Sequence, residues 1–543
     1  MEKTSPYEEG NPQAKILVLG EAPARVEMRL GRPLVGPSGD VFQDCLHTAG
    51  LKRSDLYILN VWEDMVTKDK LGTFYDSMKQ PLYTKRGFTE YGLGEAQKTL
   101  QRIEKSGCNV ILTLGEVGLT LLSGTKRPML KWRGSPLWSS LVKRKFIPTI
   151  HPAATLHGVY IWRYLIINDM KKLVRHKDEP RLRLPARELL VRPSLRDVLA
   201  YMDQCLLAGR VATDLEVINH QISCFSLSYK KEEALTVPLT AEGGGDYWSQ
   251  EDEEKVWLAY AKLMGNTRIA KINQNLIGFD CPFLLSQCHI HTHGPVYDTM
   301  IAQHVMYPEF PKGLDFIASV HTDEPYWKDD GKIWKNPKIG WEQFQQYCGR
   351  DACVALEAWD VLSGEMSAGD YWPTYDMTAR LREPLAYMTV RGLKADKDGM
   401  EHTKLLLEQA IARLETELRS VSVAEFNCNS PKQCNEYFYE ILKIKPYVNA
   451  EGNPTTDDKA LSRIARTAKK GAKEAKIVQK IRNLKKLKNT YVEVTLDKDS
   501  RLRCSWNPRG TWTGRLSSSQ TLFGTGMNLQ NLDPRFKGFI VAG

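Results

Sequence analysis

The sequence of 543 residues lacks the features that mark membrane-spanning, secreted and metal-cluster proteins. No uninterrupted apolar run approaches the ~18–20 residues that a membrane span needs. The first ten residues, MEKTSPYEEG, are polar and acidic, which is atypical of a secretory signal. The eleven cysteines include no CxxC pair and no Cys/His cluster at zinc spacing. We therefore expect reduced cysteines, a cytoplasmic protein and no membrane partner.

The chain is too long for one ordinary domain, and its charge is uneven. A length of 543 residues suits three or four units. The formal net charge is +10, which favours a polyanionic partner. Between Lys459 and Lys488 there are twelve Lys or Arg residues and one acid, Glu474. Apolar residues in the same stretch recur at helical spacing, so one helix face can pack while the other presents cations.

Glycine, proline and charge divide the chain into three blocks. The runs AKILVLG (14–20) and NVILTLG (109–115) read as buried strands that enter loops. The charged stretch RHKDEPRLRLPARE (175–188) reads as a linker. A second α/β block begins at RVATDLE (210–216), and the chain from Pro384 to about Thr490 is mostly helical in pattern. The sequence therefore predicts an α/β multidomain protein.

The first block carries five loop or strand-end segments in order, of which three contain both Gly and Pro. They are GEAPARVE (20–27), GRPLVGPSG (31–39), YILNV (57–61), KWRGSP (131–136) and HPAA (151–154). Such strand-end loops let the backbone approach a ligand closely. Together the segments resemble the family-4 uracil-DNA glycosylases of bacteria and archaea over about residues 10–175. We assign residues 1–178 to a glycosylase-like α/β/α sandwich.

The resemblance implies a pocket for a flipped base, with two departures from the family. It would place Glu21 near the attacking water, Asn60 on the uracil edge and His151 on the developing uracil anion. The family's cluster cysteines are missing, so no iron–sulfur cluster is expected. Leu34 stands where the family has an aromatic ring that stacks on uracil, a loss of about 1–3 kcal/mol of base binding. Excision of uracil, binding of uracil or DNA without excision, and a purely structural role stay open.

The second block supplies carboxylates from separate elements. Asp214 and Glu216 lie two apart on one face of a strand, and Asp280 ends NQNLIGFD. In YCGRD, Tyr347 and Asp351 are one helical turn apart. Converging carboxylates repel one another unless divalent cations lie between them. Two ions of Mg²⁺ or Mn²⁺ in such a site would support phosphodiester hydrolysis.

In this order, with YDTMIAQHV (297–305) between them, these motifs resemble a known nuclease domain. It is the proofreading 3′–5′ exonuclease domain of family-A DNA polymerases, of the DEDDy type. The resemblance makes Asp214, Glu216, Asp280 and Asp351 the metal ligands, and it makes Tyr347 the residue that positions water and phosphate. We assign residues 187–375 to this ribonuclease-H-like domain. The details NLIGFD and TDEPYWK favour phage enzymes, which would act in the cytoplasm of a bacterial host.

The third block carries five further segments, and they resemble the thumb and the start of the palm of family-A DNA polymerases. The segments are EPLAYMTVRGLKADKDGM (383–400), NSPKQCNEYFYEIL (429–442), KLKNTYVE (486–493), TGRLSSS (513–519) and NLQNL (528–532). We assign residues 376–543 to a helical thumb with an incomplete palm. The resemblance implies DNA contacts from Arg515 near the primer end, with Gln530 and Asn531 beside it. From the basic stretch we add Lys485, Lys486 and Lys488.

These expectations combine into one function and two alternatives. The favoured one is the N-terminal part of a replicative family-A polymerase that binds primer-template DNA and single-stranded 3′ ends. The family's polymerising carboxylates would follow the segments present here, so we expect a second chain with palm and fingers, or else a truncated reading frame. The alternatives are a stand-alone repair nuclease or glycosylase and a non-catalytic DNA-binding subunit.

Overall fold

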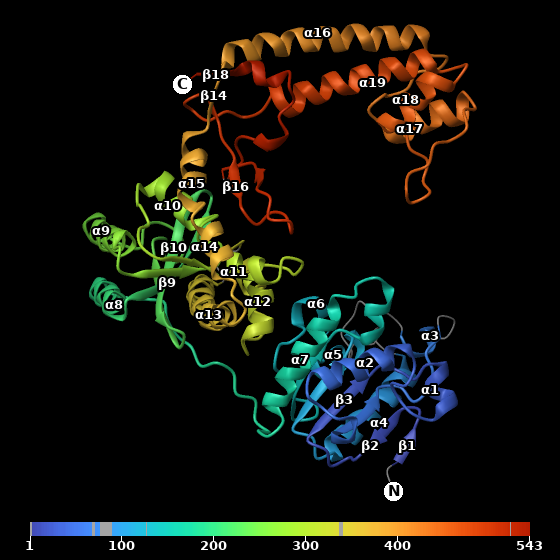
Figure 1. Ribbon diagram of the computed structural model, residues 1–543, viewed down its shortest axis with the longest axis vertical. Helices are drawn as coiled ribbons and strands as arrows, with labels where there is room; N and C mark the ends of the chain where they lie inside the picture. The colour runs from blue at the N-terminus through green and yellow to red at the C-terminus, as the bar shows by residue number, and fades with distance from the viewer. Residues whose placement is uncertain are drawn as a thin grey trace. The chain divides into compact units, whose positions relative to one another are not determined.

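The computed structural model describes residues 3–67, 71–75, 89–125, 127–335, 340–521 and 523–542. The chain divides into two compact units, which are considered separately (Figure 1). Unit 1 comprises residues 1–280 and 287–379, and unit 2 comprises residues 281–286 and 380–543. The expected α/β multidomain class is confirmed. The three domain boundaries proposed from the sequence stay predictions.

The N-terminal part of unit 1 is built on a sheet with the strand order β1-β2-β4-β3-β5-β7-β6. Its central strands β4, β3, β5 and β7 are parallel, and every residue of ILVLG in β3 is buried. The strands are β1 (Lys3–Ser5), β2 (Glu8–Gly10), β3 (Ile16–Gly20), β4 (Leu56–Asn60), β5 (Val110–Leu114), β6 (Leu137–Ser139) and β7 (Arg144–Thr149). Continuous apolar runs predict strands covered on both faces, as is found here.

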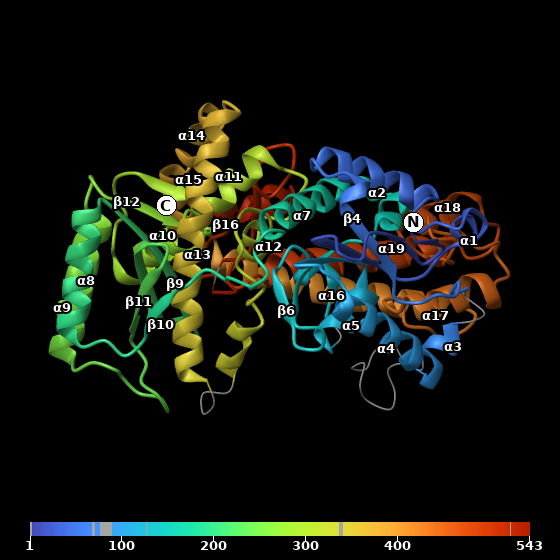
Figure 2. The ribbon, with the colours of Figure 1, turned by 90° about the horizontal axis from the view of Figure 1, so that it is seen from below.

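Helices cover both faces of this sheet (Figure 2). Helices α2 (Pro37–Thr48) and α7 (Trp162–His176) lie on one face. Helices α4 (Glu90–Lys105) and α5 (Glu116–Ser123) lie on the other. Shorter helices are α1 (Arg25–Leu30), α3 (Leu71–Phe74) and α6 (Met129–Trp132). The α/β/α layering expected from the strand and loop pattern is therefore present.

The second part of unit 1 is a six-stranded sheet with the order β13-β12-β9-β10-β11-β8. Strands β9, β10 and β11 form an antiparallel meander, and β12 and β13 continue it in parallel from β9. The strands are β8 (Glu188–Leu190), β9 (Arg210–Ile218), β10 (Gln221–Lys230), β11 (Glu233–Pro238), β12 (Ala270–Asn273) and β13 (Val296–Asp298). The ribonuclease-H-like assignment of residues 187–375 stays a prediction.

The long helix α13 (Trp341–Ala368) packs against β9, β10 and β11. Gly349 permits the close approach, because a Cβ at this position would come within 2.9 Å of Thr236 Oγ1. Thr236 Oγ1 also donates to the Gln345 carbonyl at 2.9 Å, which fixes the helix on the sheet. The other helices are α8 (Leu195–Ala208), α9 (Gln250–Gly265), α10 (Asp280–Cys288), α11 (Thr299–Met306), α12 (Leu314–His321) and α14 (Trp372–Ala379).

Buried charges join the two parts of unit 1. Arg133 and Asp169 form an ion pair in which both side chains are at most 1% exposed, and Arg133 also donates to Ser319 Oγ at 2.9 Å. Lys172, which is fully buried on α7, donates to the Gly134 and Thr322 carbonyls. Burial lowers the pKa of Lys172 to about 7. Because Ser319 and Thr322 belong to the α12 region, these contacts hold the first sheet's helices to the second domain.

Unit 2 is mainly helical and also contains short strands. Helix α16 (Lys397–Val421) packs along α19 (Ala472–Lys486), and α18 (Asp458–Thr467) packs on α19. The expected apolar face is present, since Ile477, Ile481 and Leu487 are buried. The remaining elements are α15 (Arg382–Arg391), α17 (Pro431–Asn435), β14 (Leu393–Ala395), β15 (Arg501–Leu502), β16 (Ser505–Asn507), β17 (Ser517–Ser519) and β18 (Ile540–Val541).

Helices long and apolar enough to cross a bilayer are absent from the part of the chain that the structure describes.

Candidate functional site

The carboxylates of the second domain come from separate elements and lie close together. Asp214 and Glu216 project from β9 on either side of the buried Leu215, and Asp280 begins α10. Asn273, at the end of β12, bridges two of them: its Nδ2 donates to Asp214 Oδ1 at 3.1 Å and to Asp280 Oδ1 at 3.3 Å. Asp280 is 2% exposed, so this carboxylate lies inside the site rather than on its rim.

Asp351 and Tyr347 approach from α13 and share a cation that sequence reasoning missed. Lys328 Nζ donates to Asp351 Oδ2 and, at 2.9 Å, to the Tyr347 hydroxyl. Trp327 Nε1 donates to Asp351 Oδ1 at 2.6 Å. The sequence contains a signal for this cation, because Lys328 ends TDEPYWK (322–328), a segment that carries part of the family resemblance.

Burial and mutual repulsion dominate the electrostatics of this cluster. Burial and the Asp351 charge raise the pKa of Asp214 to about 7. Burial and the neighbouring carboxylates raise the pKa values of Glu216 and Asp280 well above their ordinary values. Burial opposes the charge of Lys328, but the carboxylates around it outweigh that effect and raise its pKa. Such a cluster gains free energy from any further cation that it can hold.

The donor set fits a hard divalent cation. Ligand atoms of Asp214, Glu216 and Cys348 lie within 4.8 Å of one another. Burial raises the pKa of the Cys348 thiol well above its ordinary value, so the thiol stays protonated and is a poor ligand. The remaining donors are carboxylate oxygens, which Mg²⁺ and Mn²⁺ prefer. The residues present therefore fit the expected ions, and the individual ligand roles stay predictions.

Asp298 is a positioning residue that the sequence reading did not assign. It lies at the end of β13, and its carboxylate accepts from the backbone nitrogens of Asn275 and Ile277, both at 3.1 Å. The same carboxylate caps α11 by accepting from Met300 N at 2.9 Å. It thereby fixes the loop that leads to Asp280. An Asp directly before a helical run is a cap signal that could have identified it.

A second cluster lies at the strand ends of the first domain. Glu21 follows β3, Asn60 ends β4 and His151 follows β7, and the carboxyl ends of these parallel strands share one edge of the sheet. Tyr75 Oη donates to Glu21 Oε1 at 2.9 Å, and Trp62 Nε1 donates to Tyr75 Oη at 3.0 Å. Burial raises the pKa of Glu21, although the Tyr75 hydrogen bond opposes this rise.

His151 is held as a neutral ring with a defined tautomer. Burial lowers its pKa to about 4, which keeps the imidazole uncharged near neutral pH. Its Nδ1 accepts from Ala153 N at 3.2 Å, so the ring proton resides on Nε2. A neutral imidazole with an Nε2–H can donate a hydrogen bond to an oxygen that gains negative charge.

Leu34 occupies a strained position in the GRPLVG loop. Its φ is +51°, and its side chain is 7% exposed and packs in the hydrophobic core. Arg53 Nη1 donates to the Leu34 carbonyl at 3.1 Å, and Glu9 holds that guanidinium. Gly39 is required beside it, because a Cβ there would lie 2.2 Å from Leu34 O. Leu34 is thus a core residue of a braced loop.

In unit 2, the two segments expected to contact DNA lie side by side. Arg515 is exposed, and its backbone N donates to Thr511 Oγ1 at 2.9 Å across a turn that contains Gly514. Gln530 Nε2 donates to the Leu516 carbonyl at 2.8 Å. Asn531 is exposed, and its carbonyl accepts from Tyr491 Oη at 3.0 Å. Among the described residues the side chains of Arg515 and Asn531 have no hydrogen bond or ion pair, while that of Gln530 ties the two segments together.

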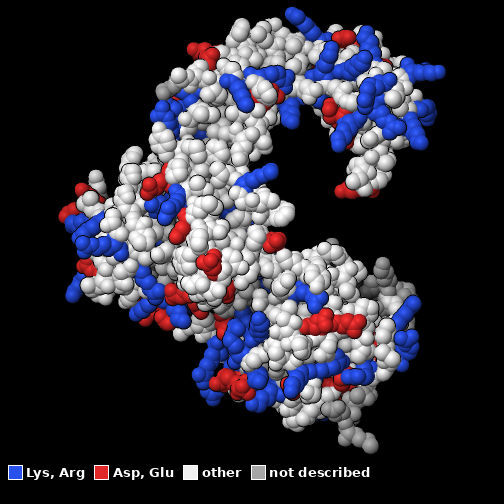
Figure 3. Space-filling view, viewed as in Figure 1, with Lys and Arg blue, Asp and Glu red and all other residues white. Residues whose placement is uncertain are grey.

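The three proposed lysine contacts differ. Lys485, on α19, pairs with Glu415 at 2.7 Å, and Lys488, in the helical turn after α19, pairs with Glu408 at 3.2 Å. Both ion pairs connect to α16. Lys486 is exposed and forms no ion pair among the described residues. Lys and Arg side chains gather over the end of unit 2 that α17, α18 and α19 form (Figure 3). That end carries exposed positive charge, and the DNA contacts expected of Lys485, Lys486 and Lys488 stay predictions.

Two families match separate segments of the chain. The uracil DNA glycosylase superfamily matches residues 7–164, and DNA polymerase family A matches residues 397–537. The type-4 uracil-DNA glycosylase of Thermotoga maritima is 30% identical over 167 residues, which cover 30% of this chain and 78% of that protein. These matches confirm the expected glycosylase-like and family-A polymerase segments.

Bacterial polymerases match a larger part of the chain at lower identity. DNA polymerase I of Borreliella burgdorferi is 23% identical over 332 residues, covering 59% of this chain and 34% of that protein. DNA polymerase I of Rhizobium leguminosarum is 28% identical over 286 residues, covering 50% of this chain and 27% of that protein. The matched regions span about a third or less of these polymerases. These matched regions are also longer than residues 397–543, so the similarity extends to residues before 397.

A solved structure shares the fold. The POL domain of Pol1 from M. smegmatis, in complex with DNA primer-template and dNTP, has a TM-score of 0.50 and 19% sequence identity. The comparison covers 65% of this chain and 58% of that one.

Proposed function

We propose that this chain combines three actions on DNA. The premise is that its N-terminal domain belongs to the uracil DNA glycosylase superfamily and that it carries a DNA polymerase family A segment. The second domain degrades single strands from the 3′ end. Unit 2 holds primer-template duplex. The glycosylase-like domain recognises uracil in DNA and excises it weakly or not at all.

The carboxylate cluster is the observation that carries the nuclease proposal. Asp214, Glu216, Asp280 and Asp351 would hold the cations. In such a site, bound Mg²⁺ or Mn²⁺ supplies activation of water and stabilisation of the leaving oxygen. The Tyr347 hydroxyl accepts from Lys328 at 2.9 Å. Burial and the carboxylates around Tyr347 raise its pKa, so the hydroxyl keeps a proton that it can donate to the attacking water or to a phosphate oxygen.

Degradation of end-labelled single-stranded DNA tests this activity and its direction. With a 5′ label, the full-length chain and Mg²⁺ should yield a ladder that shortens with time. With a 3′ label, it should release mononucleotide from the outset. Excess chelator should stop both. Degradation in chelator, or immediate mononucleotide release from the 5′ label, would refute the proposal.

The grip on duplex rests on the exposed Arg515, since a guanidinium fork matches phosphate oxygens and base-edge acceptors. Arg515→Ala should weaken binding of a primer-template duplex in a fluorescence anisotropy titration. It should leave single-strand degradation unchanged, because that reaction uses unit 1. The matched control is Arg501→Ala, whose guanidinium already bonds the Arg391 carbonyl at 3.2 Å. Equal binding by Arg515→Ala and the unmodified chain would refute the role.

Polymerisation would need the two-metal carboxylates of a palm in addition to these residues. We propose that palm and fingers residues, on the same polypeptide or on a second chain, complete a replicative polymerase of the phage type. Primer extension measured with and without a polypeptide that carries those residues tests this. Extension by the 543 residues alone would refute it.

A further inference from the structure

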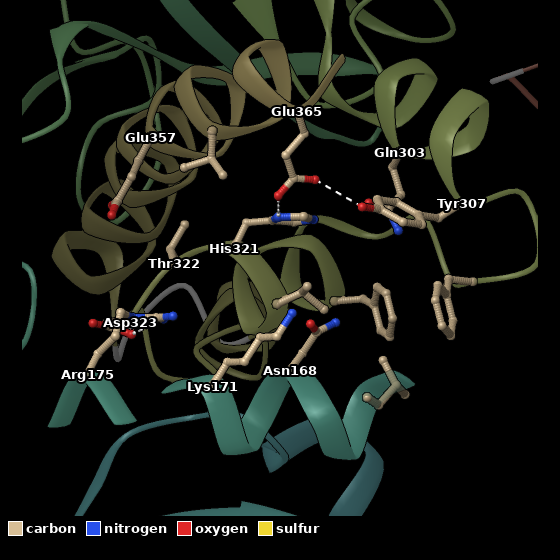
Figure 4. Close-up of a pocket in the computed structure, with 15 residues that line it drawn as sticks. Asn168, Lys171, Arg175, Gln303, Tyr307, His321, Thr322, Asp323, Glu357 and Glu365 are labelled. Carbon is tan, nitrogen blue, oxygen red and sulfur yellow. Dashed lines mark hydrogen bonds and ion pairs between the residues drawn. The ribbon is translucent and has the colours of Figure 1, made fainter. Parts of the chain in front are cut away.

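A cavity of about 390 Å³ lies between the two domains of unit 1, away from the carboxylate cluster and from the glycosylase-like strand ends. Helix α7 forms one wall, and α11, α12 and α13 form the others (Figure 4). Its size falls within the range of small-molecule sites. Neither proposed reaction uses any of the residues that line it.

Two residues that line this cavity carry a buried side-chain atom without a hydrogen-bond partner among the described residues. Gln303, which is 1% exposed, has no hydrogen-bond partner for its Oε1 among the described residues. His321, whose side chain is 4% exposed, likewise has none for Nε2. Leaving such atoms unbonded costs about 1–3 kcal/mol each. An unpartnered pair in one cavity therefore points to a polar ligand.

The tautomer of His321 follows from its neighbour. His321 Nδ1 lies 3.1 Å from Glu365 Oε1, and the Tyr307 hydroxyl donates to Glu365 Oε2 at 3.1 Å (Figure 4). An ionised carboxylate only accepts, so Nδ1 carries a proton, and in the tautomer with that single ring proton Nε2 is an acceptor. Gln303 Oε1 is an acceptor as well. Together they suit the amino group of a nucleobase.

The α7 wall offers positive charge. Lys171 points into the cavity from α7 (Figure 4) and makes no hydrogen bond or ion pair with the residues that the structure describes. Arg175 Nη2 lies 3.5 Å from Asp323 Oδ1, which is a long ion pair. His176 Nε2 lies 3.3 Å from the other oxygen of the same carboxylate. Phe310 and Phe316 also line the cavity, with ring centroids 5.7 Å apart, and provide an aromatic surface.

We propose that this cavity binds a nucleoside 5′-monophosphate. Lys171 and Arg175 would take the phosphate, Phe310 and Phe316 would contact the base, and the acceptors Gln303 and His321 would read an exocyclic amine. The proposal rests on the proposed nuclease activity, whose product is such a nucleotide. Because the ligand would touch both domains, binding would also stiffen their junction.

Isothermal titration calorimetry with dAMP at pH 8 tests the site. The protein is the full chain carrying Asp214→Ala and Glu216→Ala, in chelator, so that the carboxylate cluster cannot hold a nucleotide through metal. dAMP should bind with one site per chain and at least tenfold more tightly than deoxyadenosine, inorganic phosphate or dTMP. The nuclease assay is run separately on the unmodified chain, so failure of one proposal is distinguishable from failure of the other.

Two variants locate the binding. Lys171→Met changes an exposed side chain and should weaken dAMP binding at least tenfold, whereas the control Lys105→Met, on α4, should not. Gln303→Leu should abolish the preference for dAMP over dTMP, with circular dichroism and melting temperature verifying its fold. Absence of dAMP binding, binding no tighter than that of inorganic phosphate, or binding indifferent to Lys171→Met would each overturn the proposal.

Discussion

The two polar clusters of unit 1 show how sheets covered by helices can support different chemistry. In the first domain the cluster lies at the ends of parallel strands, whereas in the second domain Asp214 and Glu216 lie within β9. The second domain brings four carboxylates together, with one lysine among them. The glycosylase-like domain places a single carboxylate, Glu21, near a neutral histidine. The second domain's cluster thus concentrates negative charge that a cation would offset, whereas the first domain's cluster has one carboxylate beside an uncharged ring.

The comparison shows that buried charge separates the two sites better than position does. Burial raises the pKa of Glu21 in one site and those of Asp214, Glu216 and Asp280 in the other. Only in the second do neighbouring carboxylates add to that rise. Removing a carboxylate should therefore matter most in the nuclease-like site, and changing a packing residue should matter most in the glycosylase-like one.

The largest expected effect is loss of nuclease activity. Asp214→Ala with Glu216→Ala removes both β9 carboxylates, and without them the cations lose most of their ligands. We expect at least a thousandfold slower Mg²⁺-dependent degradation of single-stranded DNA, measured on denaturing gels. The control Glu251→Ala with Glu254→Ala removes two exposed acids of α9 and should keep full activity. Persistent activity in the Asp214 and Glu216 variant would break the comparison, because the cluster would then not be the metal site.

A second effect concerns the lysine inside the carboxylate cluster. Lys328→Met removes a cation that bonds Asp351 and repels any added ion. We expect Mn²⁺ to bind about tenfold more tightly, since even a screened charge at this range contributes more than 1 kcal/mol. Calorimetric titration with Mn²⁺ measures this affinity. The control is Lys332→Met, since Lys332 forms an exposed ion pair with Asp329. Weaker Mn²⁺ binding would instead make Lys328 a holder of Asp351 in its ligating position.

The sequence predicted the backbone better than the polar contacts. Buried runs such as ILVLG and the loop order predicted the first domain's α/β architecture, because strand burial and loop chemistry are local signals. Lys328, Asp298 and Tyr75 escaped prediction, because their roles depend on which distant element folds against them. Lys485 and Lys488 were proposed as DNA contacts from local charge alone, yet both form ion pairs with α16.

A third prediction tests whether the two sites share a rigid junction. The pKa of Lys172 is lowered from 10.5 to about 7, so between these values the unfolded chain binds a proton that the folded chain does not. The free energy of unfolding of unit 1 should therefore rise with pH from 7 to 9, by up to about 1.4 kcal/mol per pH unit. Lys172→Met should remove that slope in urea unfolding followed by tryptophan fluorescence, and Lys177→Met should retain it. A slope unchanged by Lys172→Met would show that Lys172 is not buried at the junction.

The smallest expected effect lies in the glycosylase-like site, where Leu34→Phe restores an aromatic ring. Stacking on a flipped base would contribute about 1–3 kcal/mol. However, Leu34 is 7% exposed in the core and its carbonyl faces Gly39, so a larger side chain costs a similar amount in overpacking. We therefore expect at most a few-fold tighter binding of uracil-containing DNA, with uracil release still slow. His151→Ala should remove whatever release remains, because it deletes the Nε2–H that would stabilise the departing base. Rapid uracil release by the unmodified chain that is lost in His151→Ala would show that a flipped uracil needs no aromatic partner in this pocket. Both sites of unit 1 would then be catalytic.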